Sequence, residues 1–256
     1  MSAIHFTVTS TAKNAAQWAK RCVASVHAQA YPNWKHIYVA ADHATGRAAQ
    51  GDYPTRLMAA AFDLLVLYSD APSLANLWPI WQSLPDDEVI VWLDGDDWLA
   101  DDFALSTLKQ YYESEFAPWL TYGQFRFTNA PPGFSSTRGF AAPYESNENV
   151  RTAPWRATHL KTFRAGLVKR IAEDDLKKPD GSWCDFCTDH VIMLPLMEMA
   201  GIDRCLFIPN TLSVYNYEAS YGATHVDDPA ALAVEEAERA RLCALPSYKR
   251  LEMRPW

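Results

Sequence analysis

Three carboxylates, at Asp94, Asp96 and Asp97, follow directly after the apolar run EVIVWL of residues 88–93. Carboxylates this close repel one another unless a cation joins them, and a divalent ion with oxygen ligands is the simplest partner. An ion held there could also bind a diphosphate and neutralise its charge as it departs. An acidic turn that only caps the next helix is the alternative, but the apolar strand before it favours a metal site.

The elements that must position this cluster alternate between strand and helix. We predict strands at residues 3–9, 36–41, 64–68 and 88–93, and helices at residues 14–29, 73–84 (with Ser73 as N-cap) and 101–116. This alternation is typical of parallel β-α-β units in an open α/β sheet that is covered on both faces. Ligands of such sheets bind beyond the carboxyl ends of the strands, where Thr9-Ser10, Asp42-His43 and Asp94–Asp97 are placed.

The second half of the sequence is less regular. We predict a long loop at residues 129–149 that could act as a mobile lid, and a short helix at 163–171. A helix at 189–200, with Pro195 inside it, should end at Gly201. Short strands are expected at 205–208 and 212–215, followed by a helix at 228–244. No linker or repeat interrupts the sequence, so we expect a single domain over residues 1–256.

Composition excludes several classes of protein. The chain has 256 residues with 49% hydrophobic and 21% charged residues, which excludes a disordered or collagen-like protein. No apolar run approaches the roughly 20 residues that span a bilayer. The N-terminus MSAIHFTVTS lacks the features of a signal peptide, so we expect a cytoplasmic protein. The net charge of −8 excludes a globally basic nucleic-acid-binding protein.

The charge is nevertheless uneven. Residues 119–171 contain eight Lys/Arg and two acids, a local charge of +6, which leaves −14 for the rest of the chain. Aromatic residues are interleaved with these bases, a pattern that can bind a polyanion. One hypothesis is an anionic acceptor contacted by Arg138, Arg151 and Arg156, such as DNA with a hydroxymethylated pyrimidine that is flipped out of the helix. Ordinary core packing with solvated charges is the alternative, and it accounts for most of these residues.

Several segments in a fixed order resemble one protein family. They are SVHAQAYPNWKHIYVAAD (25–42), SLANLWPIWQSL and DDEVIVWLDGDDWL (within 73–99), HLKTFRAGLVKRI (159–171), TDHVIMLPLMEMAG (188–201) and IPNTLSVYN (208–216). Together they resemble family 2 glycosyltransferases with the GT-A fold. The resemblance implies a Rossmann-like, mostly parallel central sheet flanked by helices. Residues 1–118 would bind the nucleotide-sugar, residues 119–226 would form a less regular acceptor and catalytic half, and residues 227–256 would form a C-terminal helix and tail.

The resemblance also implies roles for individual residues. Asp96, with Asp94 or Asp97, would hold Mn²⁺ or Mg²⁺ against the diphosphate of the donor. The expected donor-binding residues are Thr9 (through its backbone), Asp42, Asn76, Asp94 and Gly95. Asp189 lies where the family carries its catalytic base, and such a carboxylate takes the proton of the acceptor hydroxyl in an inverting transfer. The alternative for Asp189 is an acid favoured by the dipole at the start of a helix.

Histidines and cysteines give weaker indications. By resemblance, His225 is a candidate third metal ligand, although a histidine in a loop can simply be exposed. His159 could contact a phosphate or cap a strand, and Lys161 and Arg156 are further candidates for acceptor or phosphate contacts. Cys184, Cys187 and His190 suggest zinc, but a single Cys-x-x-Cys is half of a structural zinc site. We therefore interpret these last three residues as local packing.

The sequence thus predicts a metal-dependent, inverting glycosyltransferase that uses a nucleotide-sugar, with UDP as the expected nucleotide. A nucleotidyltransferase is one alternative, but it would need a glycine-rich basic loop after the first strand, and TSTAKNAAQW has no glycine. A carbohydrate-binding module that uses the acidic turn for Ca²⁺ is the second alternative. A chain of this size with acids at the strand ends is elaborate for such a module.

Overall fold

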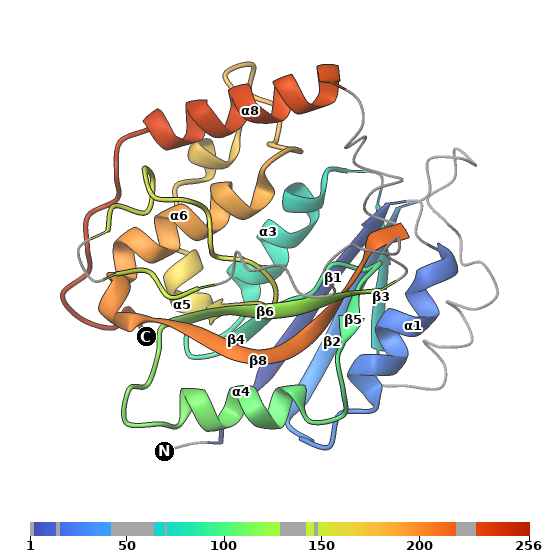
Figure 1. The fold of residues 1–256 in the computed structure, drawn as a ribbon. Helices are drawn as coiled ribbons and strands as arrows, with labels where there is room; N and C mark the ends of the chain where they lie inside the picture. Colours follow the sequence, from blue (N-terminus) through green and yellow to red (C-terminus); the bar gives the residue numbers. More distant parts are fainter. Residues whose placement is uncertain are drawn as a thin grey trace.

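The computed structural model describes residues 3–13, 16–41, 64–69, 71–128, 142–145, 148–218 and 229–256. Its centre is an eight-stranded sheet with the strand order β3-β2-β1-β4-β7-β6-β8-β5 (Figure 1). Of the predicted loop at 129–149, only 142–145 and 148–149 fall within the described residues. Within these ranges, no helix combines the length and apolarity required to cross a bilayer.

The N-terminal strands form the parallel part of the sheet. The elements are β1 (Phe6–Lys13), α1 (Ala16–His27), β2 (Trp34–Ala41), β3 (Leu64–Tyr68), α3 (Ser73–Ser83) and β4 (Val89–Trp92). β1 pairs in parallel with both β2 and β4, and β2 pairs in parallel with β3. The predicted β-α-β arrangement is confirmed. Ser73 is the first residue of α3 rather than its N-cap, because Pro72 occupies that position.

The second half of the chain extends the same sheet with antiparallel pairs. Its elements are β5 (Trp98–Leu99), α4 (Ala104–Tyr112), β6 (Leu120–Thr128), β7 (Lys161–Arg164), α5 (Ala165–Val168), η1 (Glu173–Leu176), α6 (Thr188–Ala200), η2 (Ile202–Arg204), β8 (Cys205–Asn216) and α8 (Pro229–Ala244). β7 runs antiparallel to both β4 and β6, and β8 pairs in parallel with β6 and antiparallel to β5. Four of the seven pairings are therefore parallel.

Three predicted elements in this half differ from the structure. The helix predicted at 163–171 is wrong in its first residues, because Phe163 is a fully buried strand residue whose ring packs edge-on against Trp81. The helix that follows, α5, is only four residues long. The strands predicted at 205–208 and 212–215 are one strand, β8, which continues through Pro209 and Asn210. We did not predict β6 from the sequence.

Two apolar clusters cover the two faces of the sheet. One packs α3, α5 and α6 around large side chains such as Trp81, Trp92 and Phe163. The other packs α1 and α4 against β1 and the opposite side of β4. Figure 1 shows α3, α6 and α8 over one face and α1 and α4 over the other. Because both faces are covered, ligand access is expected at the carboxyl ends of the strands.

Candidate active site

The acidic loop after β4 is held against the end of β1 by backbone hydrogen bonds. Leu93 N–H donates to the carbonyl of Thr9 (3.1 Å), and Gly95 N–H donates to the carbonyl of Thr11 (2.9 Å). A Cβ on Gly95 would lie 2.6 Å from Cβ of Ala12 and 2.9 Å from the Thr11 oxygen, so a glycine is needed for this approach. The loop therefore presents its carboxylates at the carboxyl end of the parallel strands.

Asp94, Asp97 and His159 form the candidate metal-binding group. Each offers one ligand atom, and these atoms all lie within 4.8 Å of one another. His159 Nδ1 lies 3.7 Å from Asp94 Oδ2 and 4.0 Å from Asp97 Oδ2. Asp97 is buried, and its Oδ1 accepts a hydrogen bond from Asn216 N–H (2.8 Å). Its Oδ2 has no hydrogen-bond partner among the described residues. A buried carboxylate oxygen without a donor, facing a second carboxylate and an imidazole, is suited to a divalent cation.

The charges of this group favour a cation. Burial raises the pKa of Asp94 and of Asp96, and it raises that of Asp97 further, with added repulsion from the other two carboxylates. Burial, and then Lys161, lower the pKa of His159 to about 4. His159 is therefore neutral at neutral pH, which is the form that ligates metals. The three residues fit a divalent ion in geometry, and a bound cation would relieve the repulsion among the carboxylates.

A buried ion pair lies next to the metal-binding group. Lys161, on β7, is fully buried and donates to Asp189 Oδ1 over 2.6 Å. Its Nζ also lies 4.5 Å from the centre of the Trp92 ring. Burial alone would lower the pKa of Lys161, but Asp189 and Asp94 outweigh burial and raise it.

Asp189 lies in the first turn of α6, and 29% of its side chain is exposed. Burial would raise its pKa, but Lys161 and His159 outweigh that effect and lower it. Asp189 is therefore ionised at neutral pH and can accept a proton.

Aromatic side chains from β6 and β8 surround His159. The ring centre of Phe125 lies 5.5 Å from that of His159, and the ring centre of Tyr215 lies 5.0 Å from it. Phe127 packs edge-on against Phe125 at 5.1 Å and against Tyr215 at 5.4 Å. These contacts restrict the His159 ring and keep its Nδ1 directed at the two carboxylates.

Of the other predicted donor-binding residues, Thr9 lies inside β1, paired with the last residue of β4, and Asn76 lies near the start of α3. Thr9 is fully buried, and its hydroxyl accepts a hydrogen bond from Trp81 Nε1 (3.1 Å). Asn76 lies in the first turn of α3 and donates to the carbonyl of Ala71 (2.9 Å). The hydroxyls of Thr11 and Ser73 lie 2.5 Å apart and join the start of α3 to β1. The donor contacts of Thr9 and Asn76 stay predictions.

The structure brings together only some of the predicted metal ligands. Asp94 and Asp97 meet at the site, whereas Asp96, although adjacent, is outside the three-residue group. Asp42 and His225 lie outside the described residues. His159, a candidate for contacting a phosphate or capping a strand, faces the two carboxylates. His159 precedes β7, which pairs antiparallel with β4. We did not predict that pairing, and no local sequence pattern indicates that His159 lies near the acids.

Most of the described basic residues of segment 119–171 form ion pairs or hydrogen bonds within the protein. Arg151 is buried and binds Glu198 through both Nε (2.5 Å) and Nη2 (2.8 Å). Arg156 Nη1 pairs with Glu148 Oε2 at 2.6 Å. Arg151 therefore has a structural role, contrary to the hypothesis that it contacts an acceptor. Arg138 lies outside the described residues.

The two cysteines of the CDFC segment face α8. Cys184 Sγ lies 3.4 Å from Glu238 Oε1, and Cys187 Sγ lies 3.4 Å from the carbonyl of Glu235. Burial raises the pKa of both thiols to about 12, so both are protonated at neutral pH. A protonated thiol can donate to these oxygens and is a poor metal ligand.

Comparison with known proteins identifies the fold. The chain is similar to S. aureus TarS 1–349 in complex with UDP, with a TM-score of 0.58, 15% identity, and coverage of 94% of this chain and 70% of that one. It is also similar to the mannosyltransferase PcManGT from Pyrobaculum calidifontis in complex with GDP-Man and Mn²⁺, with a TM-score of 0.55, 14% identity, and coverage of 93% and 69%. The chain spans 42% of the longer S. aureus TarS structure. No protein-family profile and no curated protein matches it. The chain therefore has a GT-A glycosyltransferase fold like that of family 2.

Proposed function

We propose that this protein is a metal-dependent glycosyltransferase that moves a sugar from a nucleotide-sugar, with UDP as the expected nucleotide, to an acceptor hydroxyl. The main support for the proposal is the group Asp94, Asp97 and His159. In this group, the buried Oδ2 of Asp97 has no hydrogen-bond partner among the described residues. This group lies at the edge where sheets of this type bind nucleotides. Similar folds bind UDP, UDP-GlcNAc, or GDP-Man with Mn²⁺.

Asp94, Asp97 and His159 would hold Mn²⁺ or Mg²⁺, with Asp96 as a further candidate ligand. The bound ion would neutralise charge on the diphosphate of the donor. Two carboxylates and one imidazole leave coordination positions for phosphate oxygens. Gly95 keeps the loop close to β1, and the N-terminus of α3 faces the same edge, where its dipole favours phosphate.

Asp189 would act as the general base of an inverting transfer. Its ionised carboxylate takes the proton of the acceptor hydroxyl while the acceptor oxygen forms a bond to the anomeric carbon. The bond from that carbon to the donor phosphate breaks, and its electron pair leaves with the nucleoside diphosphate. Lys161 would orient Asp189 through one of its two oxygens, which leaves the other available for the acceptor.

A screen of nucleotide-sugars for release of nucleoside diphosphate, with Mn²⁺, with Mg²⁺ or with chelator, tests this function. We expect release from a single donor, only when a divalent ion is present. Asp94→Asn should reduce the rate at least about 100-fold, because it removes charge where the leaving group departs. Asp102→Asn, which changes an exposed acid outside the site, is the matched control and should retain the parental rate. Equal release in chelator-treated buffer would refute the proposal.

A further inference from the structure

A wide groove runs along α8 from Ala233 to Cys243. It contains about 1180 Å³ of empty space, including its open mouth. Trp155 and His190 line one side, and Ala233, Ala237 and Ala240 of α8 line the other. Residues 232–237 are all exposed, although the carbonyl of Glu235 contacts Cys187 Sγ. The groove is large enough for a ligand of several sugar units.

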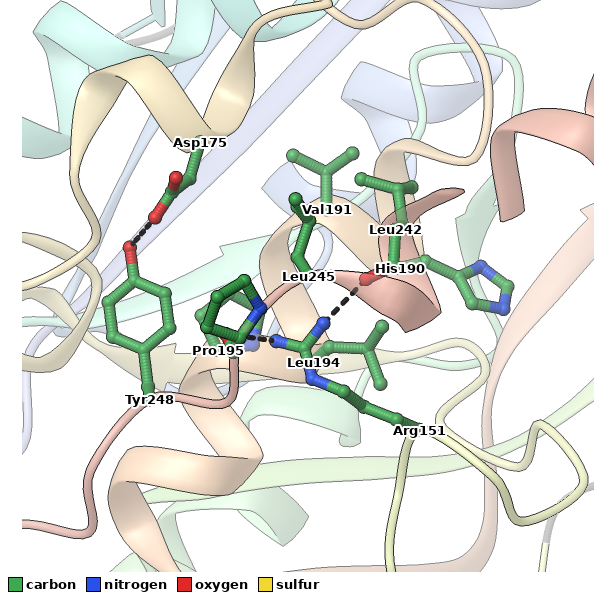
Figure 2. Close-up of a pocket in the computed structure, with 10 residues that line it drawn as sticks. Arg151, Asp175, His190, Val191, Leu194, Pro195, Leu242, Leu245 and Tyr248 are labelled. Carbon is green, nitrogen blue, oxygen red and sulfur yellow. Dashed lines mark hydrogen bonds between the residues drawn. The ribbon is translucent and has the colours of Figure 1, made fainter. Parts of the chain in front are cut away.

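An apolar pocket extends the groove inwards. It contains about 450 Å³ of empty space, including its open mouth, and shares Arg151 and His190 with the groove. Val191, Leu194 and Leu242 are among the side chains around it (Figure 2). Dashed lines in Figure 2 connect the Arg151 guanidinium to the carbonyl oxygens of Leu242 and Pro246, and another joins Tyr248 to Asp175. Arg151 therefore forms part of the wall and has its charge satisfied internally.

One residue that lines the groove is the chain neighbour of the candidate base. His190 directly follows Asp189 in α6, and its ring stacks on Trp155 with ring centres 3.8 Å apart and an interplanar angle of 22°. Burial is the main cause that lowers the pKa of His190 to about 4. Asp189 acts to raise this pKa, and Arg239 acts to lower it. His190 thus belongs to the groove lining and is the chain neighbour of Asp189, which does not itself line the groove.

The described lining of the groove carries little net charge. Arg151 is neutralised by Glu198, which it contacts through two nitrogen atoms. Arg239 lies 3.9 Å from Glu236, so the two charged residues at the α8 side oppose each other. A polyanion would need an excess of positive charge at its binding site. Trp155 and the alanines instead offer apolar surface, with a few polar groups for hydrogen bonds, which is typical of sites for neutral small ligands.

We propose that the groove between α8 and Trp155 binds the acceptor, and that this acceptor is a neutral saccharide. The apolar C–H face of a sugar ring packs on flat apolar surface, and its hydroxyls bond to Glu236 and Arg239 at the rim. The acceptor hydroxyl reaches Asp189 past His190. This inference rests on the proposed function, because it assigns the second substrate of the same reaction.

Ala237→Trp tests the proposal, because it fills the groove from the exposed surface of α8. Val234→Trp is the matched control: it introduces the same side chain on the same helix, at an exposed position that does not line the groove. Both variants and the parent are tested with a panel of neutral p-nitrophenyl mono- and disaccharides as acceptors. Duplex DNA with hydroxymethylcytosine is tested in parallel. Transfer, ligand-observed NMR binding and Mn²⁺-dependent UDP binding are measured for each protein.

We expect at least one neutral saccharide to bind and accept sugar with the parent and with Val234→Trp. Ala237→Trp should reduce that transfer at least about 10-fold while it retains UDP binding. The inference is overturned if no neutral saccharide binds or accepts sugar, if only the DNA accepts it, or if Ala237→Trp transfers as well as the parent. Failure of the parent to bind UDP with Mn²⁺ would instead contradict the proposed function, so the two failures are distinguishable.

Discussion

Lys161 is fully buried, and its Nζ lies 2.6 Å from Asp189 Oδ1, so the cation on β7 contacts the candidate base on α6 directly. The buried charge of Lys161 is not left unpaired, because Asp94 is also close enough to raise the pKa of Lys161. One side chain thus compensates both the candidate base and part of the acidic loop. Lys161 therefore offsets part of the repulsion among the buried carboxylates.

Lys161→Met should lower the free energy of unfolding by about 2 kcal/mol, because it leaves buried carboxylates without their cation. Lys169→Met is the control, since Lys169 forms a pair of the same length (2.6 Å) with the exposed Asp86. That change should cost less than about 1 kcal/mol. Urea unfolding in metal-free buffer measures both. Equal losses would mean that the Lys161 pair has no more effect than a surface pair.

Gly95→Ala should displace the acidic loop, because its new Cβ would lie 2.6 Å from Cβ of Ala12. We expect at least about a 10-fold loss of Mn²⁺-dependent UDP affinity, and partial recovery when Ala12→Gly is added. Gly181→Ala is a control away from the site: it has open space around it but a positive φ, so it should cost about 1 kcal/mol of stability without a change in UDP affinity. Normal UDP affinity in Gly95→Ala would contradict the positioning role of the loop.

Arg151→Met should destabilise the protein by about 3 kcal/mol, because it leaves the buried Glu198 carboxylate without a cation. Arg156→Met removes a more exposed pair, with 22% of each side chain accessible, and should cost about 1 kcal/mol or less. Thermal unfolding distinguishes the two variants. A stable Arg151→Met protein with weakened acceptor binding would restore the hypothesis that Arg151 contacts an acceptor.

His36 should make the protein sensitive to acid. Burial, and then His27, lower its pKa to about 3 from an ordinary value near 6.5. Below pH 6.5 the unfolded chain binds a proton that the folded protein does not. Stability is therefore lost as the pH falls from about 6.5 towards about 3, by up to about 1.4 kcal/mol per pH unit. His36→Leu should reduce this slope. Urea titrations between pH 7 and pH 4 measure it, and parallel slopes for the two proteins would contradict the prediction.

The parallel half of the fold was predictable from the sequence because each element carries its own pattern. Strand β3 matches the prediction at both ends, and α1, β2, α3 and β4 differ by only a few residues. The antiparallel half was not predictable from the sequence, because its strands pair with segments that are distant in the chain. β6 contains Gly123, which is needed because a Cβ there would lie 2.9 Å from the carbonyl of Ile208, a contact that no local pattern reveals.

The candidate site divides in the same way. Asp94, Asp97 and Asp189 could be proposed as site residues from the sequence, because they directly follow a predicted strand or begin a predicted helix. The position of His159 beside Asp94 and Asp97 was not predicted, because the pairing of β7 with β4 brings it to the acids from a distance of more than 60 residues in sequence. The internal pairing of Arg151 was also missed, since a charge count does not distinguish a basic surface from buried ion pairs.

Isothermal titration of UDP into the parent protein and Asp94→Asn, with Mn²⁺ and with chelator, tests the central claim most directly. The parent should bind UDP only with Mn²⁺. Asp94→Asn should bind at least about 10-fold more weakly, because one carboxylate ligand of the ion is lost. Binding of UDP by the parent in chelator as tightly as in Mn²⁺, with no effect of the substitution, would contradict a metal site formed by Asp94, Asp97 and His159.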